Sequence, residues 1–492
     1  MKTARLNHAR RTALAAVLGG ATLAFLSGCM VGPDYQRPGD TTSTHYDTGA
    51  EQQLDHARAV GAPRVGFDAT IDADWWTLFH SPRLDAVVKK AIDRNLDLDA
   101  ANATIGQADE AIAAAGGALQ PQVGFGAQAG RQRTGFGAGR ATSNVYSVGP
   151  TVSFDLDLFG GTRRTIEETT AVADIQRHRF DAAYLTVTGD VVTQAIQLAS
   201  ARAQIEAVNE LLATDRHNLA LVQGAKTYGS ATRGDIALAQ SQLAQDETLL
   251  PPLAQQRDTA KHALSVLAGQ GPADWVPPDF DLADFKLPAA LPLSVPSELA
   301  RQRPDILAAE SQLHATSAAI GVATADLYPH LQLSGALTQA SAGAGVGTLW
   351  GIVGALTGPI FYGGTLQANR RASVDAYQVS LANYRQTLLV SLGQVADVLQ
   401  AINHDAEEYA AQGRALDAAD ASLQLSQEGF RAGDASVLAV LDAQRARQRA
   451  LIGQIRARTA QYLDAVQLTV ALGGRSDKAF LRRAGEATPT AP

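Results

Sequence analysis

Two long stretches of the sequence repeat an apolar residue every seven positions. The repeating positions are Tyr184, Val191, Leu198, Ile205, Leu212 and Leu219 in the first stretch, and Val374, Leu381, Leu388, Val395, Ile402, Tyr409, Leu416 and Leu423 in the second. This repeat is typical of coiled coils. No proline interrupts the chain between Gly160 and Gly229 or between Gly364 and Gly433. The pattern therefore predicts two helices of about 65 residues, each roughly 100 Å long at 1.5 Å per residue.

Each long helix is expected to turn back at a glycine. Gly229 and Gly433 permit the left-handed conformation that ends many helices. The chain is then predicted to return as a second helix, over about 230–270 in the first case and about 434–472 in the second. Asp434 is a candidate cap for the second return helix. Pro251 and Pro252 should break or offset the first, because a proline ring removes a hydrogen bond of the helix.

Two segments that precede the long helices alternate apolar and polar residues, and each follows a shorter predicted helix, at about 83–117 and 297–326. The apolar positions are Tyr146, Val148, Pro150, Val152, Phe154 and Leu156 within Asn144–Asp157, and then Leu331, Leu333 and Leu337. Such alternation over about ten residues favours membrane β-strands with one lipid-facing side. Polar or small residues on the other side, Ser147, Thr151, Ser334 and Thr338, suit a wet interior. The glycine-rich stretches 131–143 and 341–347 are predicted to be hairpin loops, and soluble half-buried hairpins remain an alternative.

The sequence is organised as two similar units. Residues 95–121 align on 303–329, residues 159–162 on 362–365, and residues 229–240 on 433–444. Three landmarks in one order predict an internal duplication. Four strands per chain cannot close a barrel, for which about eight is the minimum, whereas a homotrimer supplies twelve.

The predicted fold is therefore mainly α with a β-barrel part: a trimeric channel-tunnel with four membrane strands per chain and long coiled-coil periplasmic helices. We expect a lipoprotein signal peptide at 1–28, a lipidated N-terminal segment at 29–82, a first structural repeat at 83–270, a connecting segment at 271–296, a second structural repeat at 297–473 and a polar C-terminal tail at 474–492.

The first residues read as an export signal. A basic start, with Lys2 and Arg5, precedes a short apolar segment and then Leu26-Ser27-Gly28-Cys29, which resembles the lipobox of bacterial lipoproteins. Cys29 is the only cysteine in the chain, so an internal disulfide is excluded. Lipidation, including palmitate, is predicted at Cys29. Met30 follows it in place of an aspartate, which by resemblance to lipoprotein sorting rules favours the outer membrane.

Composition and motifs argue against a nucleic-acid partner and against catalysis. The formal net charge is −8, and no basic stripe is present that could neutralise phosphates. The ten histidines lack the spacing of a zinc site. Phosphate-binding loops and hydrolase or metalloprotease signatures are missing from the sequence. We expect no catalytic residue, no metal site and no cofactor, so the protein is predicted not to be an enzyme.

Three motifs carry a family resemblance that extends from Cys29 to about Gly474. They are Val31-Gly32-Pro33-Asp34-Tyr35-Gln36-Arg37-Pro38, Trp75-Trp76 with the residues after it, and Gly358-Pro359-Ile360-Phe361-Tyr362-Gly363-Gly364. They resemble the outer-membrane efflux factor family of TolC-like proteins, in the lipoprotein branch of NodT and OprM type. The resemblance implies a homotrimeric outer-membrane channel that reaches into the periplasm, contacts outer-membrane lipids, and works with a periplasmic adaptor protein and an inner-membrane RND-type transporter in small-molecule efflux and antibiotic resistance. Trp75 and Trp76 are interpreted as packing residues.

The same resemblance implies a periplasmic gate at the helix tips. By position, Asp235 and Asp442 match gate aspartates, and the tip turns at Gly229 and Gly433 match regions that contact the adaptor. Phe430 stands where a tyrosine is common, and Arg233 is a candidate partner for Asp235. Symmetry-related carboxylates around a narrow opening favour cations and shift one another's protonation.

Two other functions remain compatible with the sequence. One is a TolC-like exit duct for type I protein secretion. The other is a structural lipoprotein whose coiled coils merely span the periplasm.

Overall fold

The computed structural model describes residues 30–39, 45–46, 64–67, 72–134, 141–342 and 345–473. Cys29, the predicted signal peptide and the predicted C-terminal tail lie outside these residues. The chain divides into two compact units, and each takes stretches from both predicted repeats. Unit one is Met1–Pro38, Thr104–Arg177 and Ala308–Arg385; unit two is Gly39–Ala103, His178–Leu307 and Gln386–Pro492.

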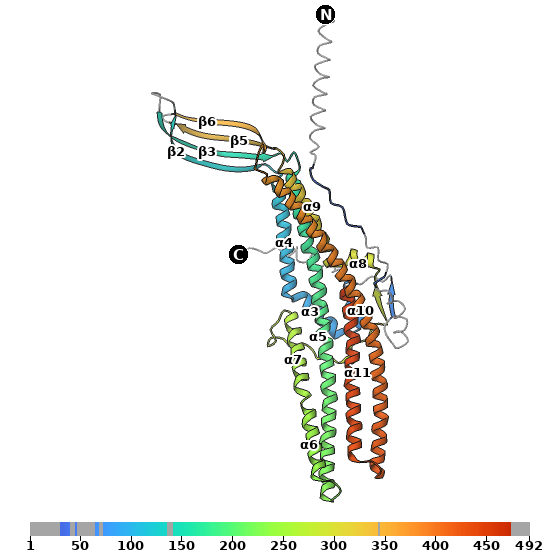
Figure 1. Cartoon of the computed structure of the whole chain (residues 1–492). Helices are drawn as coiled ribbons and strands as arrows, with labels where there is room; N and C mark the ends of the chain where they lie inside the picture. Colours follow the sequence, from blue (N-terminus) through green and yellow to red (C-terminus); the bar gives the residue numbers. More distant parts are fainter. Residues whose placement is uncertain are drawn as a thin grey trace. The chain divides into compact units, whose positions relative to one another are not determined.

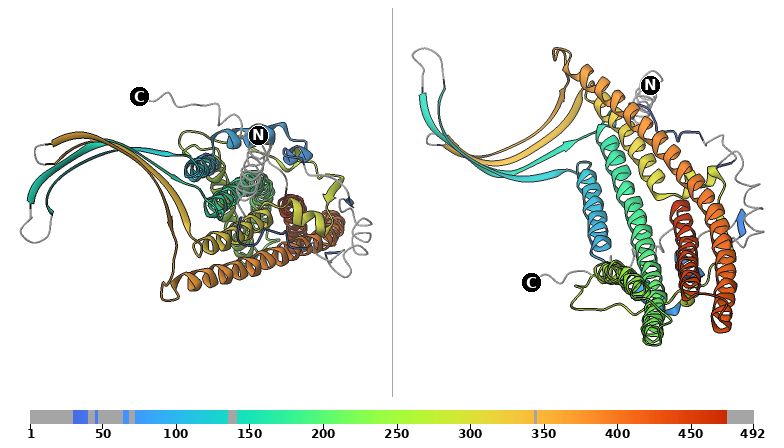
Figure 2. Two further views of the ribbon diagram at one scale, coloured as in Figure 1. Left: turned by 90° about the horizontal axis from the view of Figure 1, so that it is seen from above. Right: turned by 60° about the horizontal axis from the view of Figure 1, so that its bottom comes forward.

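Unit one contains one antiparallel sheet of four strands in the order β2-β3-β5-β6. The strands are β2 (Gln122–Thr134), β3 (Ala141–Asp155), β5 (His330–Ala342) and β6 (Gly345–Thr357). They form a single curved layer (Figure 2). The predicted loops at 131–143 and 341–347 were too long, because regular pairing continues from Gln122↔Ser153 to Thr134↔Ala141 and from His330↔Thr357 to Ala342↔Gly345.

The two predicted long helices are confirmed. They are α5 (Gly161–Thr227), with 67 residues, and α10 (Thr365–Ala432), with 68 residues (Figure 1). At the start of α5 the Asp157 carboxylate accepts hydrogen bonds from the backbone N–H groups of Thr162, at 2.8 Å, and Arg163, at 3.1 Å. These bonds satisfy donors that have no partner inside the helix.

The return helices occupy unit two. The first is interrupted, as expected, into α6 (Arg233–Glu247) and α7 (Leu250–Leu267), whereas the second is the continuous α11 (Val437–Leu472). Pro251 and Pro252 lie in the first turn of α7. Backbone N–H groups in the first turn have no partner inside the helix, so proline causes no loss of a helical hydrogen bond there. The prolines therefore set where the second piece of the first return helix begins.

The two shorter predicted helices are each split, which corrects the expectation of continuous helices over 83–117 and 297–326. The first is α3 (Pro82–Arg94) and α4 (Leu96–Gly117), and the second is α8 (Pro296–Gln302) and α9 (Pro304–Ala325). At the first break the Asn95 side chain accepts hydrogen bonds from the N–H groups of Asp97 and Leu98 and so caps α4. At the second, Pro304 holds Arg303 in an extended conformation.

An aromatic cluster forms part of the core of unit two. Trp75 and Trp76 lie in the short 3₁₀ helix η1 (Trp75–Phe79) and are 1% and 2% exposed. Trp75 donates to the Thr188 hydroxyl at 3.3 Å, and Phe79 lies 6.4 Å from Tyr462 between ring centroids. The two tryptophans are therefore packing residues, as predicted. A small parallel ladder of β1 (Arg64–Phe67) and β4 (Ala290–Leu293), which the sequence did not predict, completes this unit.

Candidate functional site

The first tip turn joins α5 to α6 through a left-handed glycine. Gly229 has φ +79°, and the backbone N–H of Ser230 reaches back to the Ala225 carbonyl at 3.0 Å. Thr232 then caps α6: its hydroxyl accepts from the Asp235 N–H at 3.1 Å, while the Asp235 carboxylate accepts from the Thr232 N–H at 2.7 Å. This reciprocal arrangement is a capping box, in which two free helix donors are satisfied at once.

The second tip turn has the same backbone plan and a weaker cap. Gly433 has φ +81°, and the Asp434 N–H donates to the Gly429 carbonyl at 2.8 Å. The residue that caps α11 is Ser436, whose hydroxyl accepts from the Ala439 N–H at 3.3 Å. The expectation that Asp434 is the cap is wrong, because Asp434 is used in closing the turn two residues earlier.

The four predicted gate residues all lie on helices near these turns, in unit two. The Thr232 N–H and hydroxyl hold the pKa of the Asp235 carboxyl below its usual value, since both stabilise its charge. Arg233 is exposed and, within the part of the chain that the structure describes, makes no ion pair with Asp235. Asp442 pairs with Arg445 at 3.3 Å and its side chain is 76% exposed. Phe430 lies in the last turn of α10 and is 43% exposed.

Exposed apolar side chains surround the same two turns. Tyr228 is 89% exposed, directly before Gly229. The others near the turns are Leu221, Leu238, Leu425, Phe430 and Leu438. Grouped apolar residues on a surface mark contact sites more often than isolated ones do. Tyr228 was not predicted from the sequence to be functional, although its place beside the turn glycine was a signal that could have identified it.

Each hairpin of unit two contains a pair of neighbouring aspartates, and neither pair was predicted from the sequence. Asp215 and Asp246 are buried in the first hairpin, and buried Asp464 lies beside the half-buried Asp405 in the second. Burial and the neighbouring Asp246 raise the pKa of Asp215 to about 7. Burial and the neighbouring Asp405 raise the pKa of Asp464 to about 8. Two neighbouring carboxyl groups that are partly shielded from water favour sharing one proton. An aspartate on the packed side of a long helix was the signal that could have revealed them.

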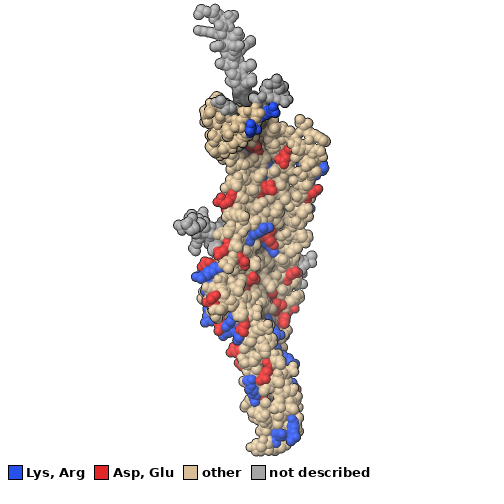
Figure 3. Space-filling model, turned by 90° about the vertical axis from the view of Figure 1, so that its left-hand side faces the viewer, with Lys and Arg blue, Asp and Glu red and all other residues tan. Residues whose placement is uncertain are grey.

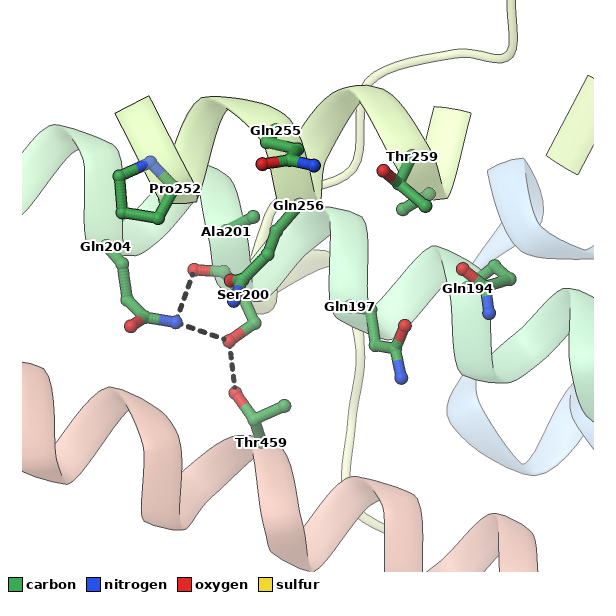
Figure 4. A pocket seen from close by; sticks show the side chains of 11 residues that line it. Gln194, Gln197, Ser200, Ala201, Gln204, Pro252, Gln255, Gln256, Thr259 and Thr459 are labelled. Carbon is green, nitrogen blue, oxygen red and sulfur yellow. Dashed lines mark hydrogen bonds between the residues drawn. The ribbon is translucent and has the colours of Figure 1, made fainter. Parts of the chain in front are cut away.

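A groove of about 520 Å³ between α5 and α7 is lined by amide and hydroxyl side chains (Figure 4). At its floor Gln204 donates to the Ser200 carbonyl and hydroxyl oxygens at 3.4 and 3.2 Å, and the Thr459 hydroxyl bonds to Ser200 at 2.8 Å. No lining residue is charged. The groove is therefore suited to hydrogen bonding with neutral groups.

The sheet of unit one has two faces of opposite character. Apolar residues occur at every second position of the strands and pair with one another across neighbouring strands, so they share one face. They are Val123, Phe125, Tyr146, Val148, Pro150, Val152, Phe154, Leu331, Leu333, Leu337, Val346, Trp350, Ile352 and Leu356. Trp350 is 77% exposed in the single chain. A large exposed apolar surface of this kind requires an apolar environment or a partner.

The other face of the sheet carries mostly small and polar residues, together with Leu349 and Val353 of β6. Ser147, Thr151, Ser334 and Thr338, which the sequence placed on the inward side, all lie on this face. The only Lys, Arg, Asp or Glu residues on the four strands are Asp155, which lies on this face, and Arg131 and Arg133, which by the strand register belong to the same face as Val123. On the surface that Figure 3 draws, positive and negative side chains are interspersed without a continuous patch of one sign.

The edges of this sheet are unpaired. Within the described residues, β2 pairs only with β3, and β6 pairs only with β5. Each outer strand therefore presents a row of backbone N–H and C=O groups that another strand can pair with.

Two further features bear on chemistry. In the described part of the chain, His, Cys, Asp and Glu do not gather in groups of three or more that could hold a metal ion. None of the helices in that part is long and apolar enough to cross a membrane.

A protein family and several known proteins match most of this chain. The family described as outer membrane efflux protein matches residues 87–270 and 295–474. The pyoverdine export outer membrane protein OpmQ of Pseudomonas putida is 30% identical over 421 residues, which cover 82% of this chain and 88% of OpmQ. Nodulation protein T of Rhizobium leguminosarum is 28% identical over 464 residues, which cover 92% of this chain and 91% of that protein.

Solved structures of the same kind superimpose on the chain. The outer-membrane channel OprN matches with a TM-score of 0.82 and 28% identity, covering 91% of this chain and 99% of OprN. The CusC channel matches with a TM-score of 0.78 at 24% identity, covering 91% of this chain and all of that chain, a likeness that concerns the fold. The predicted combination of long coiled-coil helices and a four-stranded sheet is confirmed.

Proposed function

Because this chain belongs to the outer membrane efflux protein family and is an outer-membrane channel protein, we propose that it is the passive exit duct of a tripartite efflux pump. In that role it carries drugs or other small toxic compounds across the periplasm and the outer membrane, and it performs no catalysis. The observation that carries the proposal is a sheet with one mainly apolar face, a second face rich in small and polar residues, and two unpaired edges. Such a sheet is one part of a closed wall between lipid and water.

The duct is proposed to be a homotrimer. In a closed barrel the free edge of β6 in one protomer pairs with the free edge of β2 in the next, so that no edge is left. Three protomers supply twelve strands, enough for an open interior lined by residues such as Ser147 and Thr338. The apolar face, including Trp350, then contacts outer-membrane lipids.

The helix tips are proposed to be the periplasmic end of the duct. Exposed Tyr228 and Phe430 beside the turns at Gly229 and Gly433 supply apolar surface for a periplasmic adaptor protein, which in turn links the duct to an inner-membrane RND-type transporter. Asp235, Arg233, Asp442 and Phe430 are proposed to form the gate when three copies of each meet around the axis. Asp442, with its highly exposed carboxylate, is the best placed to act on ions there.

Two further parts of the proposal concern the ends and the organisation of the chain. Cys29 is proposed to be the lipidation site, after removal of residues 1–28. The stretches 83–270 and 297–473 are proposed to be two structural repeats. Supporting this, the element order α4, β2, β3, α5 and a return helix recurs as α9, β5, β6, α10 and α11.

The proposal is tested on purified full-length protein and on a deletion strain. We expect a trimer in detergent by light scattering, ion conductance in planar lipid bilayers, and increased susceptibility to several small toxic compounds on deletion. A monomer without conductance would overturn the duct and favour a structural lipoprotein. Normal susceptibility together with loss of a secreted protein would favour a protein secretion duct instead.

A further inference from the structure

The residues that follow Cys29 in the sequence are held by specific contacts with the other stretches of unit one. The Val31 N–H donates to the Phe159 carbonyl at 3.1 Å. Met30 lies directly against Gly160, where a Cβ atom would come within 2.7 Å of the Met30 Cγ. Phe159 and Gly160 stand between the end of β3 and the start of α5. The N-terminal segment therefore begins beside the end of β3 that leads into α5, which we call the foot of the sheet.

A fully buried arginine holds this segment. The Arg164 side chain is 1% exposed and donates to the Asp34 carboxylate at 2.8 Å and to the Glu167 carboxylate at 2.7 Å. It also donates to the carbonyl oxygens of Val31, at 3.2 Å, and Gly32, at 3.4 Å. Burying a guanidinium is costly unless its donors are satisfied. Three of these four acceptors belong to the N-terminal segment, so Arg164 depends on that segment being in place.

Close backbone packing fixes the segment beside Arg164. Gly32 has φ +93°, and a Cβ atom there would lie 2.4 Å from the Gly321 Cα of α9. A Cβ atom at Gly321 would in turn lie 2.7 Å from the Arg164 Cδ. Both glycines are therefore required for the segment, α9 and the arginine side chain to pack together.

The far end of the segment is held by α9. The Tyr35 ring stacks on His314 with centroids 4.4 Å apart, and its hydroxyl donates to Glu310 at 3.4 Å. Arg37 forms an ion pair with the same Glu310 at 2.8 Å. His314 also lies 3.0 Å from Glu167, which is the partner of Arg164. The contacts thus form one connected network between the segment, α5 and α9.

We propose that residues 30–37 form a clasp that fixes the membrane anchor at the foot of the sheet, with Arg164 as its positioning residue. The inference rests on the proposed lipidation of Cys29, the residue immediately before the clasp. A lipid on an unbound tether holds the sheet only loosely near the membrane, since a flexible segment samples many lengths. When the clasp is closed, the distance between the lipid anchor and the strands is fixed. This promotes insertion of the sheet into the membrane and its assembly.

The first test measures whether the clasp is closed, on purified full-length protein. Chymotrypsin cleaves after tyrosine, and in the clasp the half-buried Tyr35 ring stacks on His314. Gly32→Ala opens the clasp from the segment side alone, and Arg164→Met opens it from α5. We expect the Tyr35–Gln36 bond to be cut at least about tenfold faster in both variants, as followed by mass spectrometry. Gly39→Ala is the matched control, because a Cβ atom there meets nothing within 4 Å. Equal cleavage of Gly32→Ala and the wild type would overturn the clasp.

The second test measures positioning in cells. With Gly32→Ala we expect unchanged incorporation of labelled palmitate but at least about threefold less SDS-resistant trimer in the outer membrane, whereas Gly39→Ala matches the wild type. Normal trimer in Gly32→Ala despite faster cleavage would overturn the positioning role. Missing palmitate in the wild type would instead refute lipidation and with it the anchor, even if the protease result stands.

Discussion

The two helical hairpins of unit two follow one plan and differ in their return arms. Both have a long arm of almost equal length and a tip glycine with φ near +80°. The first return arm is broken between α6 and α7, whereas α11 runs unbroken. The buried acidic residue of the first long arm, Asp215, lies roughly 20 Å along the helix from its tip, and Asp405 of the second lies roughly 40 Å from its tip.

The comparison shows that both hairpins share a tip glycine, whereas a continuous return arm is found in only one of them. Both tips have a left-handed glycine because most residues with a Cβ atom adopt that conformation only at a cost in free energy. A break in the return arm is tolerated because side-chain packing holds the arm: Leu253 of α7 still packs on Val208 and Leu212 of α5. Position along the hairpin also decides which part of each arm responds to protonation.

The largest expected effect is a pH response that differs between the hairpins. The pKa of Asp464 is about 8 in the folded protein and about 3.9 in an unfolded chain. Between these values only the folded state holds the proton, so stability falls as pH rises and levels off above the folded value. Hydrogen exchange in α11, corrected for its intrinsic rate, should quicken by up to about tenfold per pH unit until about pH 8.

The acidic pair of the first hairpin should give a pH response of its own. Burial and Asp246 raise the pKa of Asp215 to about 7, so the first hairpin should also lose protection as pH rises, in the part of α5 around Asp215. Asp464→Asn should remove the response of α11, and the exposed Asp442→Asn should leave it intact. A response of α11 that survives in Asp464→Asn would exclude the acid pair as its cause.

The tip glycines should show the next largest effect, and the two hairpins should respond alike. Gly229→Ala or Gly433→Ala places a side chain in the left-handed region, at a cost of about 1–2 kcal/mol. That cost corresponds to about a 5–30-fold change in local opening, measured by hydrogen exchange at the tip. Gly224→Ala, in open space within α5, should instead be neutral or stabilising by up to about 1 kcal/mol. A neutral Gly433→Ala would break the equivalence of the tips.

The caps should distinguish the tips. Thr232→Ala removes the reciprocal bonds with Asp235 and should destabilise the start of α6 by about 1 kcal/mol. Ser436→Ala removes a single hydrogen bond of 3.3 Å and should destabilise the start of α11 by only a few tenths of a kcal/mol. Local exchange rates in α6 and α11 are the measurement. Equal losses would mean that the capping box adds nothing to the first tip.

The smallest expected effect concerns the proposed gate. Asp442→Ala should raise single-channel conductance in planar bilayers by on the order of twofold, as widening a charged constriction would. Stability should change by less than about 1 kcal/mol, because the pair with Arg445 is exposed. Asp420→Ala removes a similar exposed ion pair, that of Asp420 with Arg447, and is the control. Unchanged conductance in Asp442→Ala would remove this residue from the gate.

Much of the fold was predictable because it depends on local periodicity. The seven-residue repeat predicted both long helices, and the alternation around Tyr146 and Leu333 predicted which side of β3 and β5 is apolar. The Thr232–Asp235 capping box was also visible in the sequence, although Asp235 was interpreted only as a gate residue. The break at Asn95 was missed because a single polar side chain that caps a helix leaves the apolar pattern unchanged.

Local sequence spacing was enough to predict the two long helices, the tip glycines and the apolar side of β3 and β5, since each depends on residues close together in the chain. Which residues far apart in the chain come into contact depended on tertiary packing. The burial of Arg164 under the segment that contains Asp34, and the pairing of Asp464 with Asp405, join residues far apart in the chain. Desolvation and neighbouring charge give these groups their properties, and both depend on what packs around a residue.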